Sequence, residues 1–167
     1  QLFPIHRHLT GNGVRKTLKL IKKIIPQLSI YEVPSGTKCF DWKTPLEWSI
    51  SKAYIKDENN KIIVDIKDNN LNVVQYSNKI NKKMSYADLK NHLHYIKELP
   101  NAIPYVTSYY KKNWGFCLPY NKFKKLDKKS NYKVLIDSKL FSGSLTYGEL
   151  IIPGRSKKEV FLSSYIC

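Results

Sequence analysis

Apolar residues recur at a helical spacing near the start of the chain. Four of them fall at positions i, i+4, i+7 and i+11, which places them on one face of a helix. Thr10 or Asn12 is suited to cap the first turn, and Pro26 ends the pattern because proline cannot continue a helix. The stripe consists of Val14, Leu18, Ile21 and Ile25, and the opposite face, which we expect to be solvated, carries Arg15, Lys16, Lys19, Lys22 and Lys23.

The pattern then changes from helical to extended. Residues 28–33 alternate as in a strand of mixed faces, and from Trp48 onward short β-branched and aromatic runs are separated by turn-forming Asp and Asn, as in a β-meander. Ser85 and Asp88 resemble a capping box that opens a helix ending near Pro100. The other expected extended runs are residues 37–42, 53–55, 61–66, 71–76, 103–110, 114–118 and 132–136, with a lysine-rich helix or loop at 120–130.

Two apolar runs near the C-terminus, residues 145–152 and 160–166, flank a turn at Pro153-Gly154. The second run contains no charge, so we expect a central strand that is buried on both faces, as in parallel sheets. Ligands and catalytic groups of open α/β sheets lie at the carboxyl ends of such strands. A functional site is therefore expected to begin just beyond Cys167.

These patterns predict an α/β protein in three segments. Residues 1–47 begin an α/β core, residues 48–140 form an inserted β-rich module with one helix, and residues 141–167 return to the core as a strand pair. A single α+β domain is the alternative. No basic segment followed by an apolar run opens the chain, and no apolar run approaches the roughly 20 residues that span a bilayer. We expect a cytoplasmic protein without membrane contact.

The chain has 29 Lys and Arg against 13 Asp and Glu, a formal net charge of +16. Such a charge is typical of proteins that bind nucleic acid, but all cations except Arg7, Arg15 and Arg155 are lysines. Readers of DNA and RNA depend on the arginine fork for bidentate contacts that lysine cannot make. A compositional bias towards Lys, Asn, Ile and Tyr therefore explains the charge better than a nucleic-acid site, and a polyanion-binding domain stays an alternative.

Motifs that carry chemistry are few. His6 and His8 lie two residues apart, so in an extended segment both rings face one side, but a metal pair needs a third ligand. Cys39, Cys117 and Cys167 have no paired spacing, which favours reduced thiols over disulfides or a zinc knuckle. The chain contains no zinc-protease motif, no paired carboxylates at short spacing and no complete phosphate loop.

Tyrosine and tryptophan alternate with lysine in residues 105–116, a segment that includes Trp114. Such a hairpin can stack bases or sugars, but aromatic residues more often pack into a core. This segment is the basis of a second hypothesis, a non-catalytic module that binds a glycan or a peptide.

Several strings in a fixed order carry a family resemblance over almost the whole chain. Together they resemble the N-terminal part of the bacterial DUF4910 (DUF2172-containing) aminopeptidase-like proteins, relatives of the M28 zinc aminopeptidases. One departure lies at His6 and His8, where such proteins usually read closer to PINRSLTG, whereas Arg7, Thr10 and Gly11 match. The strings are LFPIHRHLTGNGVRKTLKLI, IYEVPSGTKCFDW, PLEW, IPYVTSYY, WGFCL, GSLTYGELIIPG and EVFLSSYIC.

The resemblance implies a partial phosphorylase/hydrolase-like αβα core that is interrupted by the β-rich module. It implies a zinc-dependent hydrolase that acts on a peptide-like or aminoacylated small substrate, with the zinc ligands beyond Cys167 in the missing C-terminal part of the same polypeptide. No catalytic residue and no metal ligand is therefore assigned here, and this chain alone is expected to hold no zinc and to be inactive. The residues expected to contribute to the substrate cleft are Arg7, Trp114, Tyr147 and Tyr165.

Overall fold

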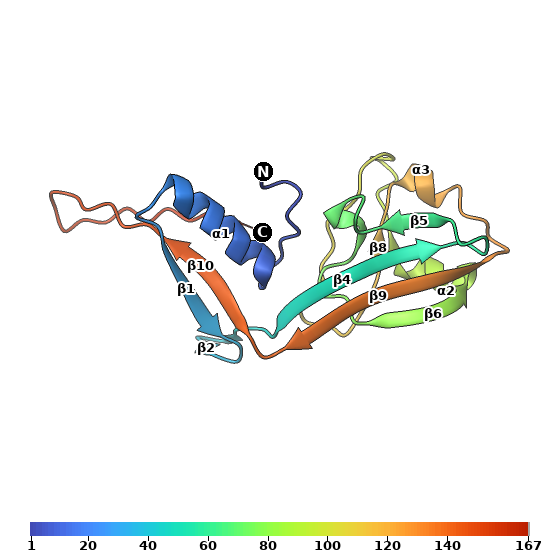
Figure 1. Ribbon diagram of the computed structural model, residues 1–167, viewed down its shortest axis with the longest axis horizontal. Helices are drawn as coiled ribbons and strands as arrows, with labels where there is room; N and C mark the ends of the chain where they lie inside the picture. Colours follow the sequence, from blue (N-terminus) through green and yellow to red (C-terminus); the bar gives the residue numbers. More distant parts are fainter. Residues whose placement is uncertain (167) are drawn as a thin grey trace. The chain divides into compact units, whose positions relative to one another are not determined.

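The computed structural model describes residues 1–166, and these divide into two compact units (Figure 1). The terminal unit comprises Gln1–Glu47 and the described residues from Phe141 onward, and the central unit comprises Trp48–Leu140. Both contain small sheets and few helices, so the protein is mixed α/β. Within the described residues, no helix is long and apolar enough to cross a bilayer.

The terminal unit is built from one helix and a two-stranded antiparallel sheet. Helix α1 (Asn12–Ile24) packs its predicted apolar stripe on strands β1 (Ser29–Pro34) and β10 (Ser144–Glu149), which pair from Ser29↔Glu149 to Pro34↔Ser144. The buried centre consists of Val14, Leu18 and Leu28, and Ile21, Ile25, Ile30 and Ile166 pack around it.

Three local features of helix α1 are its contact with Gly148, its N-cap and the charges in its last turn. Gly148 on β10 lies so close to the helix that an added Cβ would sit 2.7 Å from Cδ2 of Leu18, so a larger residue there would force the buried Leu18 side chain to shift. The N-cap is Gly11, and no side chain caps the first turn, so the prediction of Thr10 or Asn12 as cap is wrong. The last turn carries Lys22 and Lys23, whose charges suit the negative end of the helix dipole.

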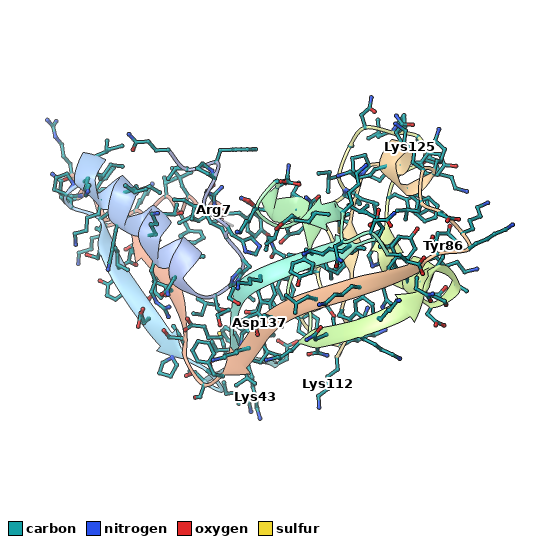
Figure 2. All side chains as sticks on the ribbon, turned by 45° about the vertical axis from the view of Figure 1, so that its right-hand side comes forward. Arg7, Lys43, Tyr86, Lys112, Lys125 and Asp137 are labelled. Carbon is teal, nitrogen blue, oxygen red and sulfur yellow. The ribbon has the colours of Figure 1, made fainter. Side chains whose placement is uncertain are left out.

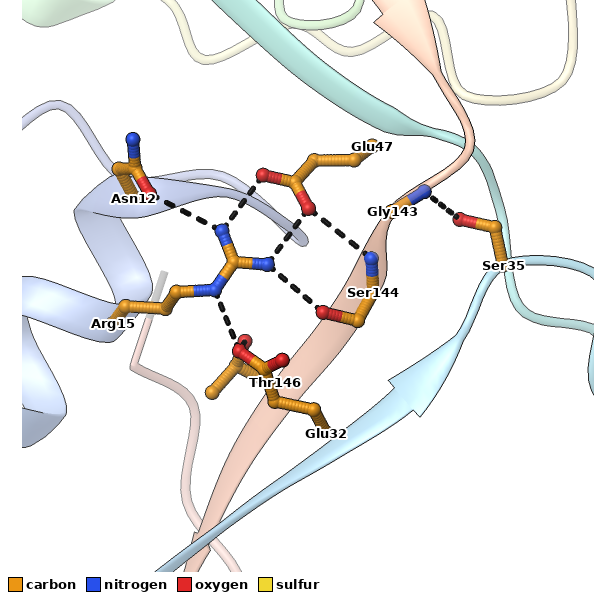
Figure 3. Close-up of polar contacts among 8 residues, drawn as sticks. All are labelled: Asn12, Arg15, Glu32, Ser35, Glu47, Gly143, Ser144 and Thr146. Carbon is orange, nitrogen blue, oxygen red and sulfur yellow. Dashed lines mark hydrogen bonds and ion pairs between the residues drawn. The ribbon is translucent and has the colours of Figure 1, made fainter.

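Arg15 joins the elements of the terminal unit through a saturated set of hydrogen bonds (Figure 3). Its two terminal nitrogens donate to the two carboxylate oxygens of Glu47, each at 2.7 Å, and Nε donates to Glu32 at 2.7 Å. The remaining N–H groups donate to Asn12 and to Ser144. A guanidinium has five N–H donors, and all five are used here. Arg15 is therefore part of the scaffold and not of the solvated outer face that was predicted.

The charge network changes the pKa values of its members. Hydrogen bonding to Arg15 lowers the pKa of Glu47 despite the opposing effect of burial, and it lowers the pKa of Glu32 on the surface. The contacts with Glu47 raise the pKa of Arg15. Glu47 also accepts from the backbone N–H of Ser144 at 3.1 Å, which ties the start of β10 to the same carboxylate.

The central unit contains a four-stranded sheet with strand order β5-β4-β9-β6. Its strands are β4 (Glu47–Lys56), β5 (Ile62–Asp65), β6 (Ile80–Ser85) and β9 (Asn131–Phe141), of which β6 has no counterpart in the predicted set. Burial alternates along β9, so one face of the sheet forms the core and the other faces solvent. Tyr132, Val134 and Ile136 are almost completely buried on the core face, together with Ala53, Ile55 and Val64 of the neighbouring strands.

The remaining elements of the central unit are short. The capping box is confirmed, because Oγ of Ser85 accepts from the backbone N–H of Asp88, but the helix it opens is brief. Residues 71–76 and 103–110, expected as strands, contribute only isolated bridges at Val73, Gln75 and Thr107. The elements are the 3-10 turns η1 (Asn70–Asn72) and η2 (Lys90–His92), helices α2 (Tyr86–Leu89) and α3 (Tyr120–Phe123), and strands β7 (Leu93–His94) and β8 (Phe116–Cys117).

Two further predictions on extended structure are corrected. Residues 37–42, expected as one extended piece, form a tight hairpin of β2 (Lys38–Cys39) and β3 (Trp42–Lys43), with Phe40 at a positive φ of 54° in the turn. Residues 160–166 form no strand, and the side chains of Val160, Phe161 and Leu162 are 86–89% exposed. A strand buried on both faces needs neighbouring strands and covering layers, and the described residues supply neither at this segment.

We predict that Arg15→Met destabilises the terminal unit by about 2 kcal/mol, because it leaves the carboxylate of Glu47 without its cation. The loss is at the low end for a broken ion pair, since the Arg15 side chain is still 22% exposed while that of Glu47 is 7% exposed. Amide hydrogen exchange of α1, β1 and β10 measures this loss. Lys19→Met, on the exposed side of the same helix, is the control and should change stability by less than about 0.5 kcal/mol. Equal exchange in both variants would contradict the role of Arg15.

Candidate functional site

The described residues offer no metal centre. No group of three or more His, Cys, Asp or Glu side chains within residues 1–166 is placed to hold a metal ion. The closest approach to one is the pair His6 and His8, whose ring centroids lie 5.4 Å apart in an edge-to-face arrangement. The predicted grouping of these two rings therefore exists, but it has no third ligand in this part of the chain.

Burial keeps both of these imidazoles neutral. It lowers the pKa of His6 to about 4. The pKa of His8 is lowered to about 3, mainly by burial and further by His6, although the charge of Glu47 opposes the change. Neutral, buried rings at the base of α1 suit a packing role in the lead-in segment. The same segment holds Arg7, which donates through Nη1 to the carbonyl oxygen of Leu2.

The other two cleft candidates of the terminal unit lie on its surface. Tyr147 on β10 stacks on its cross-strand partner Tyr31 of β1, with ring centroids 5.3 Å apart, and both rings are 43% exposed. Tyr165 is 93% exposed within the C-terminal segment. Arg7 lies in the lead-in to α1, Tyr147 on β10 and Tyr165 in the C-terminal segment, so the three candidates come from different parts of the terminal unit.

Trp114 lies in the central unit and is engaged by a histidine. Its ring stacks on the ring of His92 at 3.7 Å with an interplanar angle of 15°, and its carbonyl oxygen is 3.0 Å from Nδ1 of His92. Gly115 follows it in a position where an added Cβ would lie 2.8 Å from the carbonyl oxygen of His92. His92 and His94 occupy η2 and β7, which corrects the prediction of one helix that runs from the Ser85 capping box to near Pro100.

A tyrosine cluster around Gln75 is the main polar feature of the 105–115 loop. The hydroxyls of Tyr105 and Tyr109 both donate to Oε1 of Gln75, at 3.2 and 3.3 Å. The backbone of Gln75 also bonds the loop, since its N–H donates to Val106 O and its carbonyl accepts from Ser108 N. Gln75 therefore anchors this loop to the central unit.

An aromatic stack continues from this cluster into the core. The Tyr76 ring lies between Trp48, stacked at 5.6 Å, and Tyr109, edge-on at 4.7 Å. Tyr76 has φ 63°, a left-handed conformation that is strained for an aromatic residue and persists only where packing holds it. The residue pattern does not predict the anchoring role of Gln75 or the left-handed conformation of Tyr76, because residues 71–76 have the pattern of an ordinary strand. At the outer end of the stack, Tyr110 is 83% exposed.

The cysteines do not supply a nucleophile in the described residues. Burial raises the pKa of Cys117 to about 12, so its thiol stays protonated and inert. Cys39 is exposed in the β2–β3 hairpin, and Cys167 lies outside the described residues. Cys117 is therefore not an activated nucleophile of the kind that acyl transfer needs.

Comparison with known proteins gives a consistent set of similarities. Residues 47–139 match the family described as "Domain of unknown function (DUF2172)". The whole chain is 51% identical to a Clostridium acetobutylicum protein named "Putative polysaccharide biosynthesis protein with aminopeptidase-like domain". The structure also resembles a crystal structure of a "putative peptidase" from the same organism, with a TM-score of 0.84 and 53% identity over 88% of this chain.

The matched proteins are much longer than this chain. It spans 38% of the length of the curated relative and 34% of the crystallised chain. The family match ends at residue 139, so it covers almost the whole central unit and none of strand β10.

We predict that the terminal unit loses stability below about pH 6.5, where the histidines of an unfolded chain take up protons. The folded state excludes these protons because burial holds His6 near pKa 4 and His8 near pKa 3, so stability is full above pH 6.5 and falls as the pH approaches 4. The loss at pH 5 should be on the order of 1–2 kcal/mol per histidine. Hydrogen exchange of α1 at pH 7.5 and pH 5 measures it. His6→Gln with His8→Gln should flatten this dependence, and an unchanged slope would contradict the assignment.

Proposed function

The chain belongs to the DUF2172 family, and on this premise we propose that it is the N-terminal portion of a zinc-dependent, aminopeptidase-like hydrolase. Two relatives at 51 and 53% identity support the class, since one is named for an aminopeptidase-like domain and the other as a peptidase. We also propose that the protein is related to the M28 aminopeptidases and to the DUF4910 proteins. The substrate class is a peptide-like or aminoacylated small molecule.

In this proposal the two units have different roles. The terminal unit begins and resumes a phosphorylase/hydrolase-like αβα core, and the central unit, which carries the family match, is the inserted module. A two-stranded sheet is marginally stable by itself, and this one packs on a single helix, which agrees with a core that is completed by further chain. The relatives have that further chain, because the present one spans little more than a third of each.

The observation that carries the proposal is the exposed apolar segment of the terminal unit. Ile151, Ile152 and residues 160–162 are each at least 75% exposed, and Tyr165 is 93% exposed. Folded proteins seldom leave such a run of large apolar side chains in water, and where they do it marks an interface. We assign this interface to the rest of the same polypeptide.

Residues 1–166 do not fit a zinc site, because no three potential ligands converge there. Of the pair His6 and His8, His8 is buried and His6 is partly buried, and the pair has no third ligand in the described chain. We therefore assign the zinc ligands and the catalytic groups to the longer polypeptide and none of them to this chain. Arg7, Tyr147, Tyr165 and Trp114 remain proposed contributors to the substrate cleft.

We predict that the longer polypeptide hydrolyses aminoacyl-anilides, loses this activity with a chelator and regains it with zinc. Residues 1–167 alone should hydrolyse none and should bind less than one zinc ion per chain in equilibrium dialysis. Tight stoichiometric zinc binding by residues 1–167 would contradict the placement of the ligands. A longer polypeptide that binds zinc but hydrolyses no aminoacyl-anilide would contradict the proposed hydrolase activity.

We also predict opposite outcomes for Phe161→Asp in the short and long chains. In residues 1–167 the side chain is 89% exposed, so the change should alter stability by less than about 0.5 kcal/mol. In the longer polypeptide the same carboxylate would be buried against apolar groups, and the loss should exceed about 3 kcal/mol. Thermal denaturation of both proteins measures the difference, with Lys157→Asp in the exposed turn as control. A harmless Phe161→Asp in the long chain would exclude this interface.

A further inference from the structure

The solvent face of the four-stranded sheet in the central unit is strongly basic. Side chains that alternate with the buried positions point to this face, and Figure 2 shows Asp137 of β9 among them. The acids on the face are Asp65, paired with Tyr54 in the β4–β5 register, and Asp137. This face includes six lysines on its strands or at their ends: Lys52, Lys56, Lys79, Lys83, Lys133 and Lys139.

Most of these lysines have no acidic partner. Within residues 1–166, Lys79 alone of the six forms an ion pair, with Asp137 at 3.2 Å. Lys83 of β6 lies directly opposite Lys133 of β9, and like charges in this position destabilise a sheet. Glu58, whose pKa is lowered in small part by Lys83, accepts hydrogen bonds from the backbone and side chain of Asn131. A bound anion would relieve the repulsion between the two lysines.

The centre of this face is hollowed, with a volume of about 380 Å³. Its lining combines an aromatic ring and an aliphatic side chain, Tyr54 and Leu135, with the polar groups of Asn81 and Asp137 and with two of the lysines, Lys52 and Lys79. Ligand sites commonly have this composition, an apolar floor with a few fixed polar groups. Ser51 holds Asp137 in place through a 2.6 Å hydrogen bond.

The basic face is too long for one small ligand. Lys133 and Lys139 lie six residues apart on β9, which at about 3.4 Å per residue in an antiparallel strand is roughly 20 Å. A polymer that repeats its negative charge matches this length. The hollow between the lysines has room for one ring of such a polymer, with the amide of Asn81 and the carboxylate of Asp137 available to its hydroxyl groups.

From the basic face, the hollow and its hydroxyl-binding groups, we propose that this sheet face binds an acidic polysaccharide that carries carboxylates along its chain. The lysines would attract the carboxylates, and the Tyr54 ring would pack against a sugar ring. Nucleic acid is the less suited polyanion. Single strands are bound by successive aromatic residues and by arginine, whereas the strand residues of this face include no arginine and the lining of the hollow has one aromatic ring, Tyr54.

The experiment titrates residues 1–167 with polygalacturonate at 50 mM salt. Binding should weaken about tenfold in Lys83→Gln with Lys133→Gln, because two charge contacts of ordinary strength are lost. Tyr54→Ala should weaken it to a similar degree. The double lysine variant should keep or raise the thermal midpoint, because it removes a like-charge pair, so loss of binding cannot be attributed to unfolding. Lys19→Gln with Lys23→Gln, an equal charge change on α1, should bind within twofold of the unaltered chain.

Four results would overturn the proposal. The first is equal binding of fully methyl-esterified polygalacturonate, which lacks the carboxylates. The second is equal weakening by the α1 control variant, which would reduce the effect to net charge. The third is tighter binding of an oligothymidylate of the same charge that is lost in the same sheet variants, which would make nucleic acid the partner. Absence of any binding to polygalacturonate at 50 mM salt would also exclude it.

Discussion

The terminal unit depends on the match between the carboxylate of Glu47 and the guanidinium of Arg15. Glu47 is almost wholly removed from water, and a buried carboxylate is costly unless a cation and hydrogen bonds replace the solvent. Arg15 supplies the cation, and its remaining donors connect α1 to β1 and β10. The apolar contact of Leu18 with Gly148 then fixes how closely the helix approaches the sheet. A helix and two strands that would be marginal on hydrophobic burial alone thus gain a defined arrangement.

The central unit is held by a different kind of interaction, a closed apolar layer beneath one face of its sheet. Trp48, Ile55, Val134 and Ile136 are almost completely buried there. Tyr76 accepts an unfavourable backbone conformation beside this layer because its ring is enclosed by other aromatic rings. The opposite face of the sheet is free of this constraint, so its residues can be selected for binding.

Regular periodicity was sufficient to predict the elements whose residue pattern is regular over a short stretch of chain. Helix α1, strand β1 and the capping box at Ser85 follow from short-range pattern and side-chain chemistry. The network of Arg15 does not, since all its partners except Asn12 lie 17 to 129 residues away and helical spacing places it on the outer face. The prediction of a strand at residues 160–166 is wrong for a related reason. An uncharged apolar run indicates that a segment favours burial, whereas the structure it adopts depends on the elements that cover it. The tyrosine cluster at Gln75 also had no local signal, because it is formed by a loop that follows about 30 residues later.

The carbonyl oxygen of Ser77 accepts from Nε1 of Trp48 and also from Oγ of Ser138. Trp48 is the first residue of the central unit and Ser138 is near its last, so the chain enters and leaves this unit at one place. A segment whose two ends lie close together can be inserted into another protein without disturbing the fold of that protein. A single insertion between two codons of a host gene is therefore sufficient to add the whole central unit, and the same unit can be transplanted into other hosts as one cassette.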